Sequence, residues 1–199
     1  MSTLEVNKLA PLADNGTITF GDSGDTFDIP SGATLDVTGA TVSGLSAGKI
    51  GQVITTEITA TDYSNTSTSP AEVTNLNVSI TPSATSSKVL IMAKVMFGSS
   101  ANARNFIQLR RGSTKIGNSP AAGSRQEVIA VDTPVAVNDV CTSNFHYIDS
   151  PSTTSATTYK IFACREGSGA FRLNRSENDT DDASVSRGTS VITVMEVLA

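Results

Sequence analysis

The sequence lacks tryptophan and has few other aromatic residues, which make up only 5% of its 199 residues. It also lacks any apolar run near the roughly 20 residues that a membrane-spanning helix needs, so membrane insertion is not expected. Hydrophobic residues amount to 38%, below the usual share in a compact enzyme. A core of this composition has to be built mainly from aliphatic and β-branched side chains.

Positive charge is also scarce, because 14 Lys and Arg residues face 19 Asp and Glu residues. Nucleic-acid-binding proteins carry a basic face, and anionic membranes attract basic segments, so neither partner is expected. The first 16 residues have neither the basic nor the apolar part of a signal peptide, which favours folding in a reducing cytoplasm. The only two cysteines, Cys141 and Cys164, are therefore predicted to be buried thiols rather than a disulfide.

The single histidine limits the catalytic chemistry that the chain can perform. The run ITFGDSGD, residues 18–25, places Ser23 in the Gly-Asp-Ser-Gly setting of chymotrypsin-like proteases. A serine nucleophile needs a base, and in that family the histidine precedes the serine, whereas His146 follows Ser23. We interpret GDSGD as a turn, assign no catalytic residue and predict that the chain is not an enzyme.

The run GLSAGKI, residues 44–50, is similar to a phosphate-binding loop but is one residue short between its glycines, so no cofactor is predicted.

Serine and threonine are abundant, at about a quarter of the chain, and residues 14–45 arrange them in a short repeat. Its units are TITF, TFDI, TLDV and a truncated TV, separated by GDSGD, PSGA and TGA. The polar–apolar alternation predicts short strands, and the glycine-containing connectors predict turns. Units with two apolar side chains each are too small to form a core alone. Winding three copies around a threefold axis would bury these side chains, so residues 14–45 are predicted to be an intertwined trimeric β shaft.

The rest of the chain predicts an all-β fold in which the shaft is followed by a β-sandwich or jelly-roll domain over residues 52–199. Residues 46–51 are predicted to be a hinge. The run KVLIMAKVMF, residues 88–97, is predicted to be a strand buried on both sides. Gly112 is expected at the tip of a hairpin. The other predicted strands are residues 52–60, 73–80, 105–110, 126–131, 140–148, 157–165, 170–174 and 190–197.

Charged residues gather in the second half of the chain. The most acidic stretch is SENDTDDAS, residues 176–184, where the oxygen ligands for a hard cation would be Glu177, Asp179, Asp181 and Asp182. The stretch lacks the glycine and final glutamate of an EF-hand loop, so a solvated loop is predicted and no metal site is assigned. We expect the eight arginines to be solvated, to pair with the acidic stretch of a neighbouring subunit or to bind an anionic glycan. They are Arg104, Arg110, Arg111, Arg125, Arg165, Arg172, Arg175 and Arg187.

Long runs of this sequence are similar to one known group of proteins. They are MSTLEVNKL, GDSGDTFDIPSGATLDVTGATVSGLSAGKIGQV, SITPSATSSKVLIMAKV, LRRGSTKIG, FHYIDSPSTTSATTYKIFA, LNRSENDTDD and TSVITVMEV. Over nearly the whole chain they resemble the virion-fibre and tail-fibre proteins of tailed phages that infect cyanobacteria and other aquatic bacteria. The resemblance implies a homotrimer with an N-terminal attachment segment and a C-terminal β-domain that is presented to the host. It implies no catalytic residue, and it fits a fibre on the tail or on the head.

The resulting hypothesis is a virion fibre, exposed on the particle surface and assembled in the host cytoplasm. Residues 1–13 would attach it to phage tail or capsid proteins through Leu4, Val6, Leu9 and Leu12. The C-terminal domain would bind a host surface polysaccharide or protein, with Tyr147, Tyr159, Arg165 and Arg172 as candidate receptor-binding residues. One alternative is a capsid head fibre or decoration (cement) protein. Another is a polysaccharide-cleaving enzyme, which would need paired carboxylates.

Overall fold

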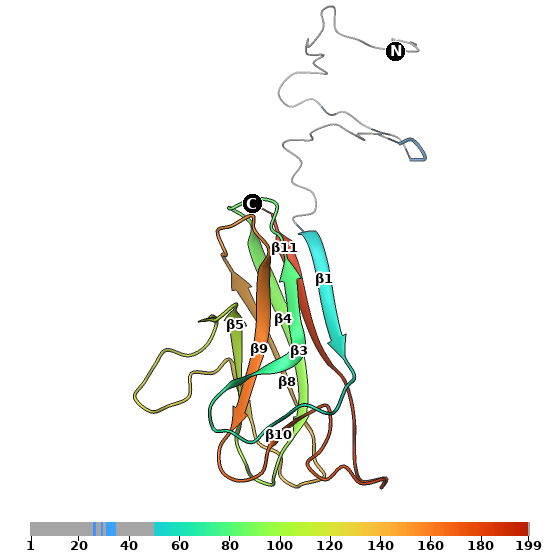
Figure 1. Ribbon diagram of the computed structural model, residues 1–199. Helices are drawn as coiled ribbons and strands as arrows, with labels where there is room; N and C mark the ends of the chain where they lie inside the picture. The colour runs from blue at the N-terminus through green and yellow to red at the C-terminus, as the bar shows by residue number, and fades with distance from the viewer. Residues whose placement is uncertain (1–25, 27–28, 30, 35–49, 199) are drawn as a thin grey trace, which may run out of the picture. The chain divides into compact units, whose positions relative to one another are not determined.

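The computed structural model describes residues 26, 29, 31–34 and 50–198 (Figure 1). The chain divides into two units, Met1–Leu45 and Ser46–Ala199. The predicted attachment segment 1–13 and most of the predicted shaft 14–45 lie outside the described residues. Within the shaft, the connector PSGA does contain the predicted turn, at residues 31–32, where Gly32 has a φ of 88°. The predicted hinge is corrected at its end, because Ile50 and Gly51 already belong to the first strand.

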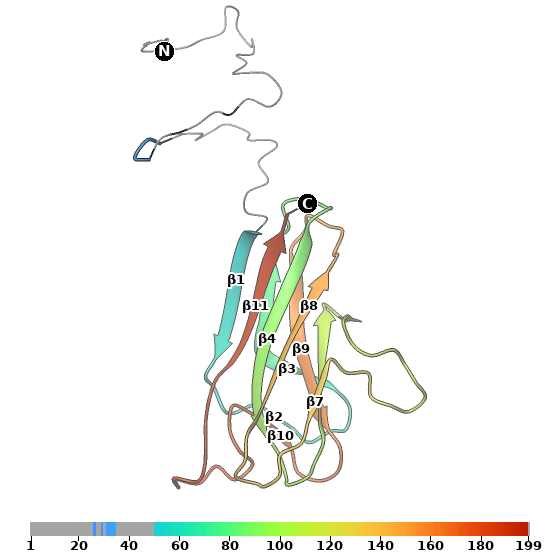
Figure 2. The ribbon, with the colours of Figure 1, turned by 180° about the vertical axis from the view of Figure 1, so that it is seen from behind.

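The first sheet of the second unit is antiparallel. Four long strands lie side by side in it, as Figure 2 shows: β1 (Ile50–Ile58), β11 (Ser190–Val197), β4 (Lys88–Gly98) and β8 (Cys141–Asp149). Beyond the end of β11, the same edge of β4 pairs with the short β10 (Phe171–Leu173), which in turn pairs with β2 (Ser64–Asn65). We call this layer sheet A.

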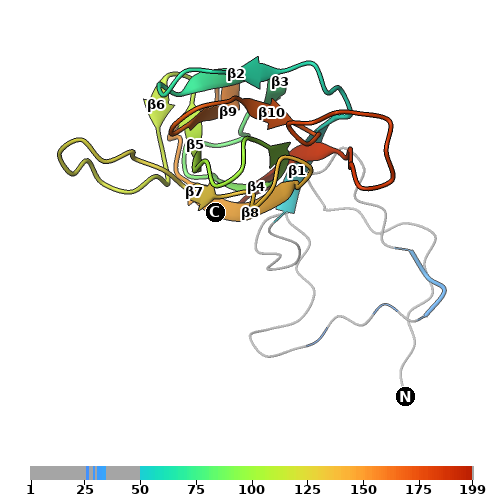
Figure 3. The same ribbon diagram turned by 90° about the horizontal axis from the view of Figure 1, so that it is seen from below.

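The second sheet, sheet B, is also antiparallel and has the order β3, β9, β5. These strands are β3 (Ala71–Ile80), β9 (Thr157–Arg165) and β5 (Asn105–Arg111). The outer edge of β5 pairs with two short strands, β6 (Thr114–Lys115) and β7 (Ala130–Asp132). Figure 3 shows the two sheets as stacked layers, which is the arrangement of a β-sandwich.

The core lies between the sheets and follows from the alternation of each strand. Every second residue of β4 is buried, from Val89 to Phe97, and meets buried side chains of β3, β5, β9 and β11. The aromatic part of the core is small, and its main contact is the stack of Phe97 on Phe171, with ring centroids 4.9 Å apart. The remaining volume is filled by aliphatic residues, as the composition requires.

The strand predictions agree closely with the observed elements. The nine predicted strands all have a counterpart, although residues 126–131 shrink to β7, and the short β2 and β6 were not expected. The hairpin prediction is confirmed, because Arg111 pairs with Thr114 across Gly112, which has a φ of 57°.

The prediction that the two cysteines do not form a disulfide is confirmed, because both thiols are free. Cys164 is buried as predicted, but Cys141 is only half-buried. The described residues contain no helix that could serve as a membrane span.

One prediction is corrected: β4 is not buried on both sides. Its outward residues include Met92, whose side chain is 46% exposed. The run is largely apolar because most residues on both sides of the strand are apolar, yet the described residues cover only one of the two sides. The outward side belongs to the exposed face of sheet A.

The strand register also defines two ends of the sandwich. The chain enters at Ile50, which pairs with Val197 near the C-terminus. At the opposite end, Ile58 pairs with Ser190, Gly98 with Arg172, and Asn105 with Arg165. The loops that leave the strands at this second end are called the distal loops here. They comprise residues 59–70, which include the short β2, and residues 99–104, 133–140, 166–170 and 174–189.

Candidate functional site

The four candidate receptor-binding residues do not form one site. Tyr159 is fully buried in β9, and its hydroxyl donates a hydrogen bond of 2.8 Å to Asp149 Oδ2 on β8. Arg111 Nη1 on β5 contacts the same carboxylate oxygen at 2.9 Å. Burial and the neighbouring Asp149 carboxylate raise the pKa of Tyr159, so the phenol stays protonated. The expectation that Tyr159 contacts a receptor is corrected, because its side chain instead joins the two sheets.

Tyr147 is also engaged within the chain. It alternates inward on β8 and packs, half-buried, against the core. Its ring lies over Gly117, where an added Cβ would come within 2.7 Å of the ring and where φ is 63°. Glycine is therefore the residue that this contact requires. The role we find for Tyr147 is to hold the loop that follows β6.

Arg165 and Arg172, in contrast, both lie at the distal end. Arg165 is 7% exposed, and its Nη2 donates to the carbonyl of Thr66 at 2.8 Å. Arg172 is half-buried on β10 and pairs with Glu177 at 3.0 Å. Its Nη1 also donates to Ser64 Oγ at 2.9 Å. The distal loops thus bring two of the four predicted residues to one end of the sandwich.

The acidic stretch lies among the distal loops and pairs with arginines of its own chain. Arg187 contacts Asp179 through two hydrogen bonds, of 2.8 and 2.6 Å, and Arg175 lies 3.9 Å from the same carboxylate. Hydrogen bonding to Arg187 lowers the pKa of Asp179, and the backbone N–H of Ser184 lowers that of Asp182. With Glu177 held by Arg172, two of the four candidate metal ligands are committed to arginines. In the part of the chain that the structure describes, no group of three potential ligands is placed to hold a metal.

Two adjoining hollows open beside these loops and share the ion pair between Arg104 and Glu166, whose side chains meet at 2.9 Å. The first, of about 570 Å³, lies between the 99–104 and 166–170 loops. The second, of about 460 Å³, is lined by Phe106 together with Arg104, Arg125 and Arg165. We call the second one the basic hollow. Three guanidinium groups around one aromatic ring, against a single carboxylate, suit a hydroxylated ligand that carries negative charge.

Sequence reasoning named Arg165 as a receptor-binding candidate and counted Arg104 and Arg125 among the arginines that could bind an anionic glycan, but it did not find Phe106 or the clustering of these residues. Phe106 and Arg104 flank the start of β5, and Arg125 comes from the long loop between β6 and β7. These residues are brought together by the pairing of β5 with β9 and by Gln126, which donates to the carbonyl of Thr68 at 3.3 Å. Neither contact has a local signature in the sequence.

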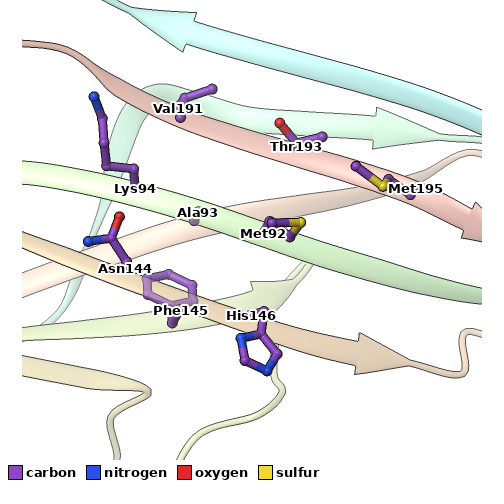
Figure 4. A pocket seen from close by; sticks show the side chains of 9 residues that line it. All are labelled: Met92, Ala93, Lys94, Asn144, Phe145, His146, Val191, Thr193 and Met195. Carbon is purple, nitrogen blue, oxygen red and sulfur yellow. The ribbon is translucent and has the colours of Figure 1, made fainter.

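A third hollow, of about 370 Å³, lies on the exposed face of sheet A (Figure 4). His146 lines it from β8 and is paired with Met92 of β4. The other lining side chains come from β4, β8 and β11, and many of them are apolar, among them Val191 and Met195. The imidazole is exposed there, while Ser23, its only proposed catalytic partner, lies outside the described residues.

Comparisons with known proteins give little further information. No protein-family model matches the chain, and no curated protein matches it. Among solved structures, it is similar to a chain of "Structure of infectious bursal disease virus Gx strain", with a TM-score of 0.37 and 16% identity over 75% of this chain. For "Structure of infectious bursal disease virus Gt strain" the TM-score is 0.39, with 13% identity over 74% of this chain. Each match covers 38% of the viral chain, and at these TM-scores neither likeness carries an argument about fold or function.

Proposed function

We propose that this chain is a homotrimeric virion fibre of a tailed phage, positioned on the tail and contacting the host cell surface. Residues 1–13 attach the fibre to the virion, residues 14–45 form the intertwined shaft, and the sandwich is a jelly-roll-like head. The proposal starts from the resemblance of long sequence runs to phage fibre proteins. It is supported by the repeat of residues 14–45, which has too few apolar side chains to form a core without partner chains.

The observation that carries the receptor-binding part is the polarity of the sandwich. The chain enters at one end of β1, and the distal loops lie at the other end of the same strands. In the proposed fibre, the distal loops are at the end of the sandwich opposite to the residue where the N-terminal segment joins it. These loops carry exposed polar residues and border the basic hollow, which makes them the natural contact surface for a host polymer.

The expected ligand is a surface polysaccharide that carries acidic groups. Arg104 and Arg125 would bind carboxylate, sulfate or phosphate groups, and Phe106 offers a flat apolar contact for a sugar ring. A shallow site of this kind binds a single sugar unit weakly. Three identical heads on one fibre engage a repetitive polymer together, and the effective concentration of the second and third site then raises the avidity.

The proposal is tested with free protein in an adsorption assay. Purified chain is expected to compete with the phage that carries it for adsorption to the host, whereas a capsid decoration protein would not compete. The double variant Arg104→Ala/Arg125→Ala should compete more weakly. Lys160→Ala is the matched control, because it removes an ion pair with Glu72 and neither side chain lines the basic hollow. Full competition by the double variant would exclude the basic hollow as the receptor site.

The same preparation tests the two alternatives. Labelled antibody against the chain should decorate the tail of intact virions in electron micrographs, and decoration of the head would favour a head fibre or cement protein. Host polysaccharide incubated with the protein should release no new reducing ends. Sustained release would overturn the expectation that the chain is not an enzyme.

A further inference from the structure

The two outer faces of the sandwich differ sharply in chemistry. On sheet B the outward side chains satisfy one another: Lys160 pairs with Glu72 at 2.9 Å, and Arg110 lies 3.9 Å from the centre of the Phe162 ring. Ser79 and Thr158 share a hydrogen bond of 2.7 Å across the neighbouring strands. This is the solvated outer face that an antiparallel sandwich normally presents.

The outer face of sheet A differs in that one row of exposed apolar side chains crosses it. This row runs through all four long strands and joins Val53, Met195, Leu90 and Ile148, each paired with the next. Val53 and Ile148 are 56% and 50% exposed. In the next row Met92 is the one apolar residue, between Thr193 and His146, and the hollow of Figure 4 lies over it. Contiguous exposed apolar surface of this kind marks an interaction site in a soluble protein.

The charges on this face are also incomplete within one chain. Glu57 lies on β1, at one edge of the sheet, while Lys88 and Lys94 lie on β4, toward the other edge. Among the described residues, none of the three forms an ion pair with its own chain. On sheet B, by contrast, Lys160 and Glu72 are paired. When copies are related by rotation, the acidic edge strand β1 of one copy can lie against the basic residues of β4 in the next copy.

The place where the undescribed segment joins the sandwich is the third observation. Residues 35–49 lead directly to Ile50, which is 48% exposed and pairs with the outward residue Val197. The proposed intertwined shaft is therefore followed in the chain by Ile50, an outward residue at the edge of this face. Chains held together just before Ile50 would start their sandwiches close to one another.

From these observations we infer that the outer face of sheet A, formed by β1, β11, β4 and β8, is the surface through which each head packs against the other copies in the trimer. The apolar row supplies the buried centre of the contact. Glu57 of one copy pairs with Lys94 or Lys88 of the next, as a cyclic head-to-tail arrangement requires. The outer face of sheet B and the distal loops stay in solvent. This inference rests on the homotrimer of the proposed function and names the interface that the homotrimer uses.

The inference is tested on the full chain by light scattering combined with hydroxyl-radical footprinting and mass spectrometry. The expected mass is three times 20.6 kDa. Labelling of each residue is compared with its labelling in the urea-unfolded chain. Met92, Val53 and Ile148 should lose labelling as completely as the buried Ile91. Val135, which is 74% exposed on a distal loop, should keep it.

Each outcome decides something different. A three-chain mass with Met92, Val53 and Ile148 labelled overturns the interface and leaves the trimer standing. A single-chain mass with the three residues labelled overturns both the trimer and the interface. A single-chain mass with the three residues protected means that the chain's own leading segment covers the face, which overturns its occupation by a second copy.

A variant pair makes the test independent of the shaft. Met92→Glu puts a charge in the middle of the face, at a side chain that a single chain leaves 46% exposed, so the fold itself should tolerate it. Val53 and Ile148 should regain labelling in this variant even where the shaft still holds three chains together. Val135→Glu is the matched control and should change neither mass nor labelling. Unchanged protection of Val53 and Ile148 in Met92→Glu contradicts the inference.

Discussion

At the residue scale, the most informative side chains are those that sequence reasoning placed on the surface and that the fold uses inside. Tyr159 alternates toward the core with Ile161 and Ala163, so its hydroxyl had to find a partner between the sheets. Asp149 supplies that partner, and Arg111 balances the buried carboxylate. Hydrogen bonds to a charged group of this kind are stronger than neutral ones. The three residues form a polar contact that links the two layers.

Removing the Tyr159 hydroxyl should destabilise the head. In Tyr159→Phe the carboxylate of Asp149, a residue that is 6% exposed, loses one of its two side-chain donors. The free energy of unfolding should fall by about 1–3 kcal/mol. Urea denaturation at one fixed protein concentration measures it. Tyr63→Phe is the matched control, because its hydroxyl makes only a long hydrogen bond of 3.4 Å to Ala71 and should matter less. Equal losses in the two variants would contradict the bridging role of Tyr159.

At the scale of single elements, strands were predictable and faces were not. Alternation of apolar residues located nearly every strand, because a strand with one buried side has a period of two. The same alternation does not say which strands are neighbours. The cross-strand row from Val53 to Ile148 and the basic hollow around Phe106 arise from pairings of residues far apart in sequence. Neither the apolar row nor the basic hollow could therefore be predicted before the strand register was known.

The end of β11 contains a buried carboxylate that ties three elements together. Glu196 is 1% exposed and accepts hydrogen bonds from the Ser83 backbone and hydroxyl, both at 2.6 Å, and from Gln52 at 2.9 Å. Burial alone would raise the pKa of Glu196, but these hydrogen bonds outweigh it and lower the pKa below its usual 4.5. The ionised carboxylate thus fixes the loop between β3 and β4 and the start of β1.

The lowered pKa of Glu196 predicts how stability depends on pH. Its contribution is present above the unfolded pKa of about 4.5 and is lost as the pH falls through the lower folded pKa. Glu196→Gln should be less stable than the native chain at pH 7, by about 1–3 kcal/mol, because Ser83 then loses a charged acceptor. This difference should shrink as the pH falls below 4.5.

Denaturant titrations of both chains at pH 7 and at acidic pH measure the difference. Glu127→Gln is the control, since it removes a surface ion pair with Lys115 and should cost less than about 1 kcal/mol. A difference between Glu196→Gln and the native chain that stays constant across this range would show that the carboxylate is not ionised in the fold.

At the scale of the whole molecule, the sandwich presents three surfaces of different chemistry. The outer face of sheet B is internally paired, the distal loops border the basic hollow, and the outer face of sheet A carries an exposed apolar row and charges that form no ion pair among the described residues. In the proposed fibre, the first of these surfaces would face solvent, the second the host and the third the other copies. The resemblance of the sequence suggested a trimer, but the surface that would form it follows only from the strand order.

Deleting residues 1–45 tests how much of the assembly resides in the head. The deletion removes the first of the two units and leaves the strands of both sheets intact. The shortened chain should keep a β-type far-ultraviolet circular dichroism spectrum and unfold cooperatively. If the outer face of sheet A forms the trimer contact, it should still sediment as three chains, with weaker association because the shaft no longer holds the copies together. A folded monomer would assign the association to residues 1–45 alone, and an insoluble product would show that the sandwich needs part of that segment to fold.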